Sequence, residues 1–298
     1  MKWKRNTGFD QIEDRRGQGG GGFSLPGGGG GGGIPIPIPG GKAGGGLGGI
    51  ITLVVLFLLF SGVLGGGGMP DLGGLNGGGG QAAPGGTLDP QSDTDQQLAY
   101  IVNSIQDFWA ASFQASGKDY PETKLVLFDG STQSACGPAS SATGPFYCPA
   151  DQKVYLDLGF FDELKSRFGA KGGDFAMAYV VAHEFGHHVQ TALGITERVQ
   201  QTSQQDPSRA NDLSVRTELQ ADCLAGVWAH SEQADLEPGD IEEALSAAAA
   251  VGDDRIQEKT TGRINPESWT HGSAEQRTAW FTTGYRSGNP DDCDTFAQ

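Results

Sequence analysis

The apolar residues of this 298-residue chain form one uninterrupted run near its beginning and a series of periodic segments after residue 87. The run, residues 47–64, has 18 residues without a charged side chain. A helix of this length just spans a bilayer, with snorkelling flanks or local thinning. A buried core helix is the alternative, but the glycine-rich sequence on both sides offers no core to bury it. The run therefore predicts one transmembrane helix.

After residue 87 the spacing of apolar side chains predicts several helices and two short strands. In residues 94–115 they recur at steps of three and four, as in an amphipathic helix. Residues 125–128 and the partly alternating residues 153–158 predict strands. Further helices are expected at residues 160–168, 174–193, 208–230, 241–250 and 273–281. The pattern predicts a helix-rich α+β fold with a small sheet, forming one domain over residues 87–298.

Glycine and charge set the expected topology before this domain. Residues 1–46 are basic and then rich in Gly and Pro, which predicts disorder, and residues 65–86 predict a flexible linker. Basic residues outnumber acidic ones before the apolar run, whereas no Lys or Arg follows it until Lys118. By the positive-inside rule, residues 1–46 are expected in the cytoplasm and the domain outside the cell membrane.

The formal net charge of the chain is −16, and its acidic excess lies after the basic amino-terminal segment. So acidic a domain repels the phosphates of nucleic acids. Nucleic acid is therefore excluded as a partner, whereas the charge says little about the fold.

The candidate chemistry is concentrated in His-Glu-Phe-Gly-His, residues 183–187. Residues four apart on a helix lie nearly one above the other, so His183 and His187 can direct two imidazoles at one Zn²⁺. Glu184 projects about 100° around the helix, beside the metal, where it can act as general base on a water molecule. Two histidines on an ordinary amphipathic helix are the alternative, but the apolar residues before them favour a buried helix. The pattern predicts metal-assisted hydrolysis of an amide bond.

A third metal ligand is expected from a later helix. The continuation His-x-x-Gly-x-x-His, found in one large class of zinc peptidases, is excluded because Gln190 and Leu193 occupy its Gly and last His positions. Glu218 and Asp222 lie four apart on one predicted helical face. Glu218 would bind the metal, and Asp222 would accept a hydrogen bond from the free nitrogen of His183. The weaker candidates for the third ligand are Glu197 and Glu232.

Two further histidines are not expected to bind this metal. His188 lies about 100° around the helix from His187, so it cannot share the metal while His183 does. We interpret it as a packing residue or a support for the site. His230 closes a predicted helix and is expected to act as a carboxy-terminal cap.

The four cysteines are expected to form disulfides, as is usual outside the cytoplasm. Cys136 and Cys148 flank a loop of turn residues, and a disulfide there would contribute about 3 kcal/mol. Cys223 and Cys293 are paired only by elimination, which would join the tail to a long helix. A metal site made of cysteines is the alternative, but the chain lacks Cys-x-x-Cys pairs.

Several motifs together resemble a bacterial family of neutral zinc metallopeptidases. They are residues 144–151, 155–157, 178–190, 218–226 and 270–273. The resemblance covers most of residues 90–298 and implies a zincin-like domain of gluzincin type, with zinc on His183, His187 and Glu218. It also implies a short cytoplasmic tail, one membrane span and a peptide or protein substrate. The glycine-rich residues 19–86 are longer than the family pattern demands.

The resemblance further implies a catalytic role for His271, in a turn before the last predicted helix. Zinc peptidases of this type supply a donor to the oxyanion from a segment after the third ligand. Arg277 could steady His271 or the oxyanion, and Tyr155 is another candidate donor. From chain order alone, substrate backbone is expected to add as an extra strand beside residues 153–158.

The sequence therefore predicts a membrane-anchored zinc peptidase that acts outside the cytoplasm. One alternative is a catalytically silent, zinc-stabilised binding module at the cell surface, against which the intact Glu184 argues. The other is an assembly protein in which the metal only stabilises the fold.

Overall fold

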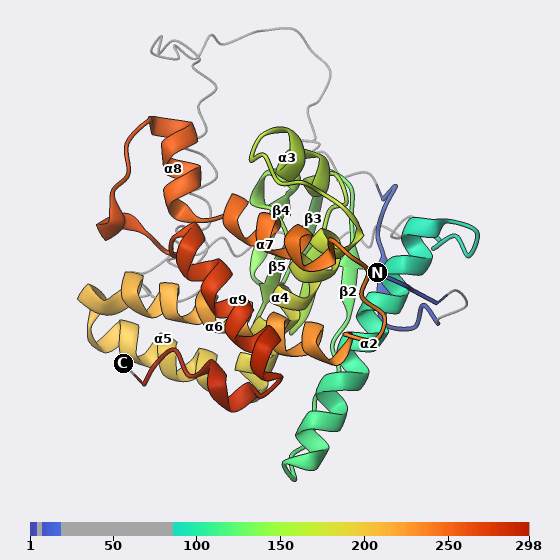
Figure 1. Cartoon of the computed structure of the whole chain (residues 1–298), viewed down its shortest axis with the longest axis horizontal. Coiled ribbons are helices and arrows are strands. Elements are labelled where there is room, and N and C mark those ends of the chain that lie inside the picture. Colours follow the sequence, from blue (N-terminus) through green and yellow to red (C-terminus); the bar gives the residue numbers. More distant parts are fainter. Residues whose placement is uncertain (5–7, 19–85, 298) are drawn as a thin grey trace, which may run out of the picture.

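The structure, a computed structural model, describes residues 1–4, 8–18 and 86–297. These residues form a helix-rich α+β domain, as the sequence predicts (Figure 1). The helices are α2 (Asp93–Ala115), α3 (Phe160–Ser166), α4 (Asp174–Ala192), α5 (Ile195–Gln205), α6 (Ala210–Ser231), α7 (Asp240–Ala250), α8 (Asp253–Thr261) and α9 (Ala274–Ser287). The strands are β1 (Ile12–Asp14), β2 (Leu125–Leu127), β3 (Ser131–Ser134), β4 (Gly137–Ser140), β5 (Phe146–Cys148) and β6 (Lys153–Leu156).

Four strands form the main sheet, in the order β1-β2-β6-β5. β1 and β6 both run parallel to β2, whereas β5 runs antiparallel to β6. The prediction that residues 153–158 offer an edge to substrate is wrong, because β6 is paired on both sides. Among the described strands, β1 and β5 form the two edges of this sheet, and β3 and β4 make a separate hairpin.

Residues 12–14 differ from the expectation that all of residues 1–46 are disordered. Ile12 pairs with Leu125 and Asp14 with Leu127, so β1 extends the sheet of the domain. Ile12 is buried in the same core as the helices. The expected disorder is therefore wrong for this strand, because its backbone groups find partners on β2.

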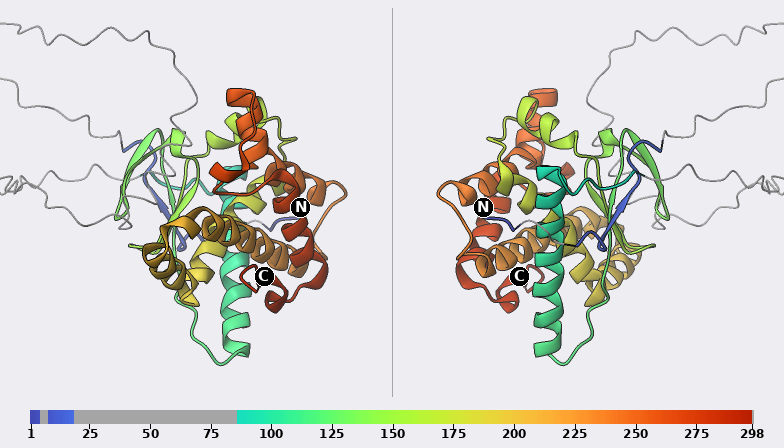
Figure 2. Two further views of the ribbon diagram at one scale, coloured as in Figure 1. Left: turned by 90° about the vertical axis from the view of Figure 1, so that its left-hand side faces the viewer. Right: turned by 90° about the vertical axis from the view of Figure 1, so that its right-hand side faces the viewer.

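Helix α4 lies at the centre of the domain. It contacts β5 and β6 on one side and α6 and α7 on the other, and α2 also packs against it. Figure 2 shows the strands on one side of the domain and α9 on the other. The buried position of α4 follows from its sequence, since its first nine residues, from Asp174 to Ala182, are almost all apolar.

Helices α6 and α9 approach each other closely through two glycines. A Cβ atom on Gly226 would lie 2.1 Å from the carbonyl oxygen of Phe281, and one on Gly284 would lie 1.9 Å from that of Cys223. No side chain larger than hydrogen fits at either position. The contact brings α9 beside the half of α6 that carries Asp222.

The structure contains both predicted disulfides, Cys136–Cys148 and Cys223–Cys293. The long predicted helices match α2, α4, α6 and α7 closely, whereas α9 continues six residues beyond the predicted end at residue 281. Helices α5 and α8 were not predicted, because their sequences are mainly polar and contain few apolar residues.

The predicted transmembrane run, residues 47–64, lies outside the described residues, as do residues 19–46 and 65–85. Within residues 1–4, 8–18 and 86–297, none of the helices combines the length and apolar character needed to cross a bilayer.

Candidate metal centre

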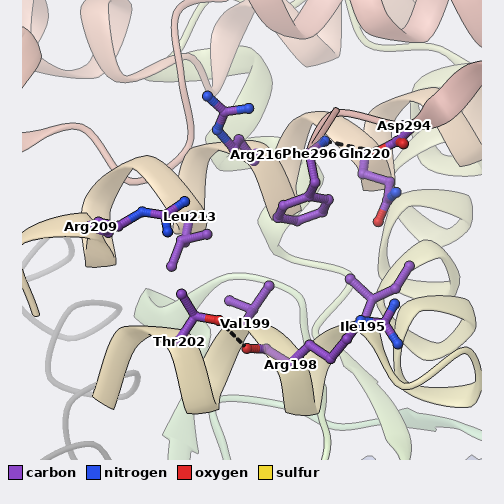
Figure 3. Close-up of a pocket in the computed structure, with 10 residues that line it drawn as sticks. All are labelled: Ile195, Arg198, Val199, Thr202, Arg209, Leu213, Arg216, Gln220, Asp294 and Phe296. Atoms are coloured by element: carbon purple, nitrogen blue, oxygen red, sulfur yellow. Dashed lines mark hydrogen bonds between the residues drawn. The ribbon is translucent and has the colours of Figure 1, made fainter. Parts of the chain in front are cut away.

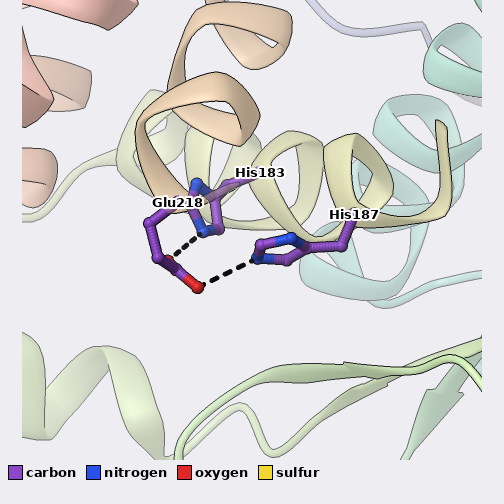
Figure 4. Close-up of side chains that lie close together, drawn as sticks. All are labelled: His183, His187 and Glu218. Carbon is purple, nitrogen blue, oxygen red and sulfur yellow. Dashed lines mark hydrogen bonds and ion pairs between the residues drawn. The ribbon is translucent and has the colours of Figure 1, made fainter. Parts of the chain in front are cut away.

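His183 and His187 lie on consecutive turns of α4, and Glu218 faces them from α6 (Figure 4). One Glu218 carboxylate oxygen lies 3.2 Å from Nε2 of His183, and the other lies 3.4 Å from Nε2 of His187. One potential ligand atom from each residue lies within 4.8 Å of the other two. The structure thus brings together the three residues predicted to hold the metal.

Hydrogen bonds at the other nitrogen of each ring set the orientation of both imidazoles. Nδ1 of His183 lies 2.9 Å from a carboxylate oxygen of Asp222, and Nδ1 of His187 lies 2.9 Å from Oε1 of Gln190. The Gln190 amide is itself oriented, because its Nε2 donates to the carbonyl oxygen of Thr217. Both Nδ1 atoms therefore donate to these acceptors, and each Nε2 is the nitrogen that faces Glu218 and can bind a metal when the ring is neutral. Two imidazole nitrogens and one carboxylate fit the donor set of a catalytic Zn²⁺.

The carboxylate of Asp222 joins three side chains of the site. It is fully buried and accepts hydrogen bonds from Tyr179 Oη at 2.6 Å, Arg277 Nε at 2.8 Å and Arg277 Nη2 at 3.0 Å, besides the bond from His183. Burial alone would raise the pKa of Asp222, but the charges of Arg277 and His183 outweigh it and lower the pKa. The predicted partnership of Asp222 with His183 is thus present and is extended to two further residues.

Glu184 lies on α4 between the two histidines and is 8% exposed. Burial raises the pKa of its carboxyl above the ordinary value, and Glu218 adds to this, while His183 and His187 oppose it. A raised pKa brings a carboxylate closer to the value that suits proton transfer near neutral pH. Burial likewise acts to raise the pKa of Glu218, but the two histidines lower it well below its ordinary value, so this carboxylate is charged.

His271 lies in the turn before α9, where Asp253 holds it. One Asp253 oxygen accepts backbone N–H bonds from Thr270, His271 and Gly272 at 2.8, 2.6 and 3.0 Å. The other oxygen lies 3.2 Å from Nδ1 of His271. Burial lowers the pKa of His271, but Asp253 and the charge of Glu218 together raise it.

Gly272 fits this turn tightly onto α6. Its φ of +86° favours glycine, and a Cβ atom there would lie 3.3 Å from side-chain atoms of Val215 and Leu219. Because Leu219 follows Glu218, the contact fixes the turn beside the part of α6 that carries Glu218.

The other candidate donors have different roles. The Arg277 side chain is 4% exposed and forms an ion pair with Asp222, so it supports that carboxylate. Tyr155 donates its hydroxyl to Asp151 and stacks on Phe146, within the sheet. The structure does not bring Tyr155 to the metal ligands.

The residues expected to lie away from the metal have partners elsewhere. His188 is fully buried, 3.1 Å from the hydroxyl of Tyr147, which agrees with a packing role. His230 bonds the carbonyl oxygen of Tyr285. Glu197 accepts from Gln201, and Glu232 accepts from Tyr100 and Ser104.

Sequence reasoning missed three residues of the site. Tyr179 and Gln190 lie four before His183 and three after His187 on α4, so helical spacing could have indicated both. Asp253 lies 18 residues before His271 and begins a separate helix, so no spacing rule connects it to the site.

A pocket of about 450 Å³ lies between α5, α6 and the carboxy-terminal residues (Figure 3). Its α6 lining includes Leu213, Arg216 and Gln220, which face the opposite side of the helix from Glu218 and Asp222. The pocket is therefore separate from the candidate metal centre.

Comparisons with known proteins match the chain to one family and to several uncharacterized relatives. The family described as "Putative neutral zinc metallopeptidase" matches residues 1–296. The chain is 44% identical over 304 residues to the uncharacterized protein YpfJ of Escherichia coli (strain K12), covering 100% of this chain and 99% of that protein. It is 52% identical over 207 residues to the uncharacterized protein Rv2575 of Mycobacterium tuberculosis (strain H37Rv), covering 65% of this chain and 68% of that protein. No solved structure matches the chain significantly.

Proposed function

The chain belongs to the neutral zinc metallopeptidase family, and on this premise we propose that it is a gluzincin-type peptidase with zinc on His183, His187 and Glu218. The observation that carries the proposal is the convergence of these three ligand atoms within 4.8 Å of one another. Asp222 and Gln190 support it, since each accepts a hydrogen bond from an Nδ1 atom and so directs Nε2 of His183 or His187 toward Glu218.

When bound, zinc lowers the pKa of a coordinated water and polarises the carbonyl of the peptide bond. Glu184 takes the proton of the attacking water and delivers it to the leaving amine. Its low exposure and raised pKa suit this exchange. Asp222, steadied by Tyr179 and Arg277, keeps the ring of His183 in place.

His271 is our candidate for the donor to the developing oxyanion. Asp253 accepts a hydrogen bond from Nδ1 of His271, so Nε2 is the nitrogen left to face substrate. Its raised pKa favours the protonated ring, in which Nε2 carries a hydrogen to donate.

For substrate binding we propose the edge strand β5. Its outer edge has no strand partner among the described residues, and β5 packs on α4, the helix that carries His183 and His187, where Tyr147 contacts His188. An extended peptide can bind such an edge through its backbone.

We also propose that the domain acts outside the cytoplasm. Two disulfides join parts of the fold that are 12 and 70 residues apart in sequence. Disulfides of this kind persist in oxidising compartments and are rare in the cytosol.

The test is the Glu184→Gln variant of the full chain, assayed for bound zinc and for cleavage of an unfolded protein substrate. The variant should keep its zinc and its fold while cleavage falls by roughly 10²–10⁴-fold. Glu197→Gln is the matched control, because that glutamate lies exposed on the next helix, and it should cleave normally. Cleavage at the wild-type rate by Glu184→Gln would exclude this residue as the base. A wild-type protein that binds zinc but cleaves none of a broad panel of substrates would favour the silent binding module.

A further inference from the structure

The amino-terminal segment, residues 8–18, is joined to the domain by backbone hydrogen bonds. Three consecutive residues of β1 pair in parallel with Leu125, Val126 and Leu127 of β2. The amide of Leu125 donates to the carbonyl oxygen of Gln11 at 3.0 Å, and the amide of Arg15 donates to that of Leu127 at 2.8 Å. β2 is itself buried, so β1 covers the flank of a core strand.

Side chains anchor the same segment on both faces. Ile12 is 8% exposed and belongs to the main core. Arg16 donates to Asp14 at 2.8 Å and to Asp95 at 2.9 Å, and the Asp95 side chain is only 4% exposed. Lys153 of β6 donates to Glu13 at 2.7 Å. These contacts reach α2, β2 and β6, which are far apart in the sequence.

These contacts involve two of the basic residues on which the prediction of a cytoplasmic amino terminus depends. The positive-inside rule counts lysines and arginines that flank an apolar run. Two of those counted, Arg15 and Arg16, are paired within the fold with Glu13, Asp14 and Asp95. Arg15 and Arg16 thus form ion pairs within the fold, so their positive charge is poor evidence that this segment is held in the cytoplasm.

We propose that residues 8–18 are a fixed part of the peptidase domain and lie on the same side of any membrane as the candidate metal centre. The hydrogen bonds between β1 and β2 can form only if both strands share one compartment. On this proposal, a cytoplasmic amino-terminal segment does not occur together with an external domain. This inference does not depend on peptidase activity.

Accessibility of single cysteines in cells tests the proposal. Asp10 is exposed in the segment, and Glu258 of α8 has a side chain that is 62% exposed. Asp10→Cys and Glu258→Cys variants of the full chain are treated with a membrane-impermeant maleimide, before and after permeabilisation. The unmodified chain is the control, because all four of its cysteines are in disulfides. Both new cysteines should react in intact cells, or both only after permeabilisation. Reaction of one before permeabilisation and of the other only afterwards would overturn the proposal.

Thermal unfolding of the purified full chain gives an independent test. Ile12→Asp places a charge in the core and should lower the Tm of the domain by on the order of 5–10 °C. Asp10→Asn, at an exposed position two residues earlier, should leave the Tm unchanged. An unchanged Tm in Ile12→Asp would show that the segment is not part of the domain.

Discussion

Asp222→Asn is the substitution that most directly probes how the protein supports its metal ligands. The Asp222 carboxylate is fully buried and accepts from Tyr179, His183 and both Nε and Nη2 of Arg277. Asparagine keeps nearly the same size but removes the charge that pairs with the Arg277 guanidinium. That guanidinium belongs to a side chain only 4% exposed, so water cannot replace the lost partner.

The expected loss of stability follows from this burial. Removing one partner of a buried ion pair costs about 3–5 kcal/mol. In a domain of this size each kcal/mol shifts the Tm by about 2–4 °C, so the metal-free Tm should fall by roughly 6–20 °C.

Zinc affinity should fall as well, by about 10–100-fold, because His183 loses the anionic acceptor that orients its ring. A second effect adds to this. Nη2 of Arg277 lies 3.9 Å from a carboxylate oxygen of Glu218, and without Asp222 the guanidinium would turn toward that metal ligand.

Two further variants separate these effects. Tyr179→Phe removes one hydrogen bond to Asp222 and should cost only about 0.5–1.5 kcal/mol. The double variant Asp222→Asn, Arg277→Met should be more stable than Asp222→Asn alone, since it leaves no unpaired buried charge. The measurements are thermal unfolding of metal-free protein and titration of zinc against a competing chelator. A loss below about 1 kcal/mol in Asp222→Asn, together with unchanged zinc affinity, would refute the reasoning.

Two other predictions concern His271 and Asp14. His271→Ala should lower kcat by roughly 10²–10³-fold with zinc content unchanged. Asp253→Asn should also lower kcat. Wild-type kcat values in both variants would remove His271 and Asp253 from the mechanism. Burial would raise the pKa of Asp14, but the hydrogen bonds and the charge of Arg16 lower it below its ordinary value. Ionised Asp14 therefore stabilises the fold fully above its unfolded-state pKa, and this contribution is lost as the pH falls through its folded-state pKa. Because Asp14→Asn lacks the titrating group, the free energy of unfolding of this variant should fall less than that of the wild type below about pH 4. Urea unfolding across a pH series measures this, and identical pH profiles for the variant and the wild type would contradict it.

The sequence by itself determined the parts of the site that depend on helical geometry. His183, Glu184 and His187 are fixed relative to one another by the rise and turn of a single helix, and Glu218 and Asp222 by those of another. Apolar periodicity likewise located the long buried helices to within a few residues, because their positions in the core require it. The hydrogen bond from His183 to Asp222 could be predicted because metal-binding histidines generally donate their other ring nitrogen to a carboxylate or carbonyl group.

Only the tertiary structure decided which distant segments meet. Arg277 reaches Asp222 because Gly226 and Gly284 let α9 approach α6, and neither glycine indicates its partner in the sequence. Asp253 holds His271 across 18 residues through backbone N–H groups, which any residue could supply.

The order of the strands in the sheet could not be predicted either, because it also depends on which distant segments meet. Alternating apolar residues predict a strand but not its neighbours, so residues 153–158 were assigned to an edge although β6 is paired on both sides. The three residues of β1 carry too weak a pattern to predict a strand at all. Their structure depends on hydrogen-bonding groups offered by β2, more than 100 residues away in the chain.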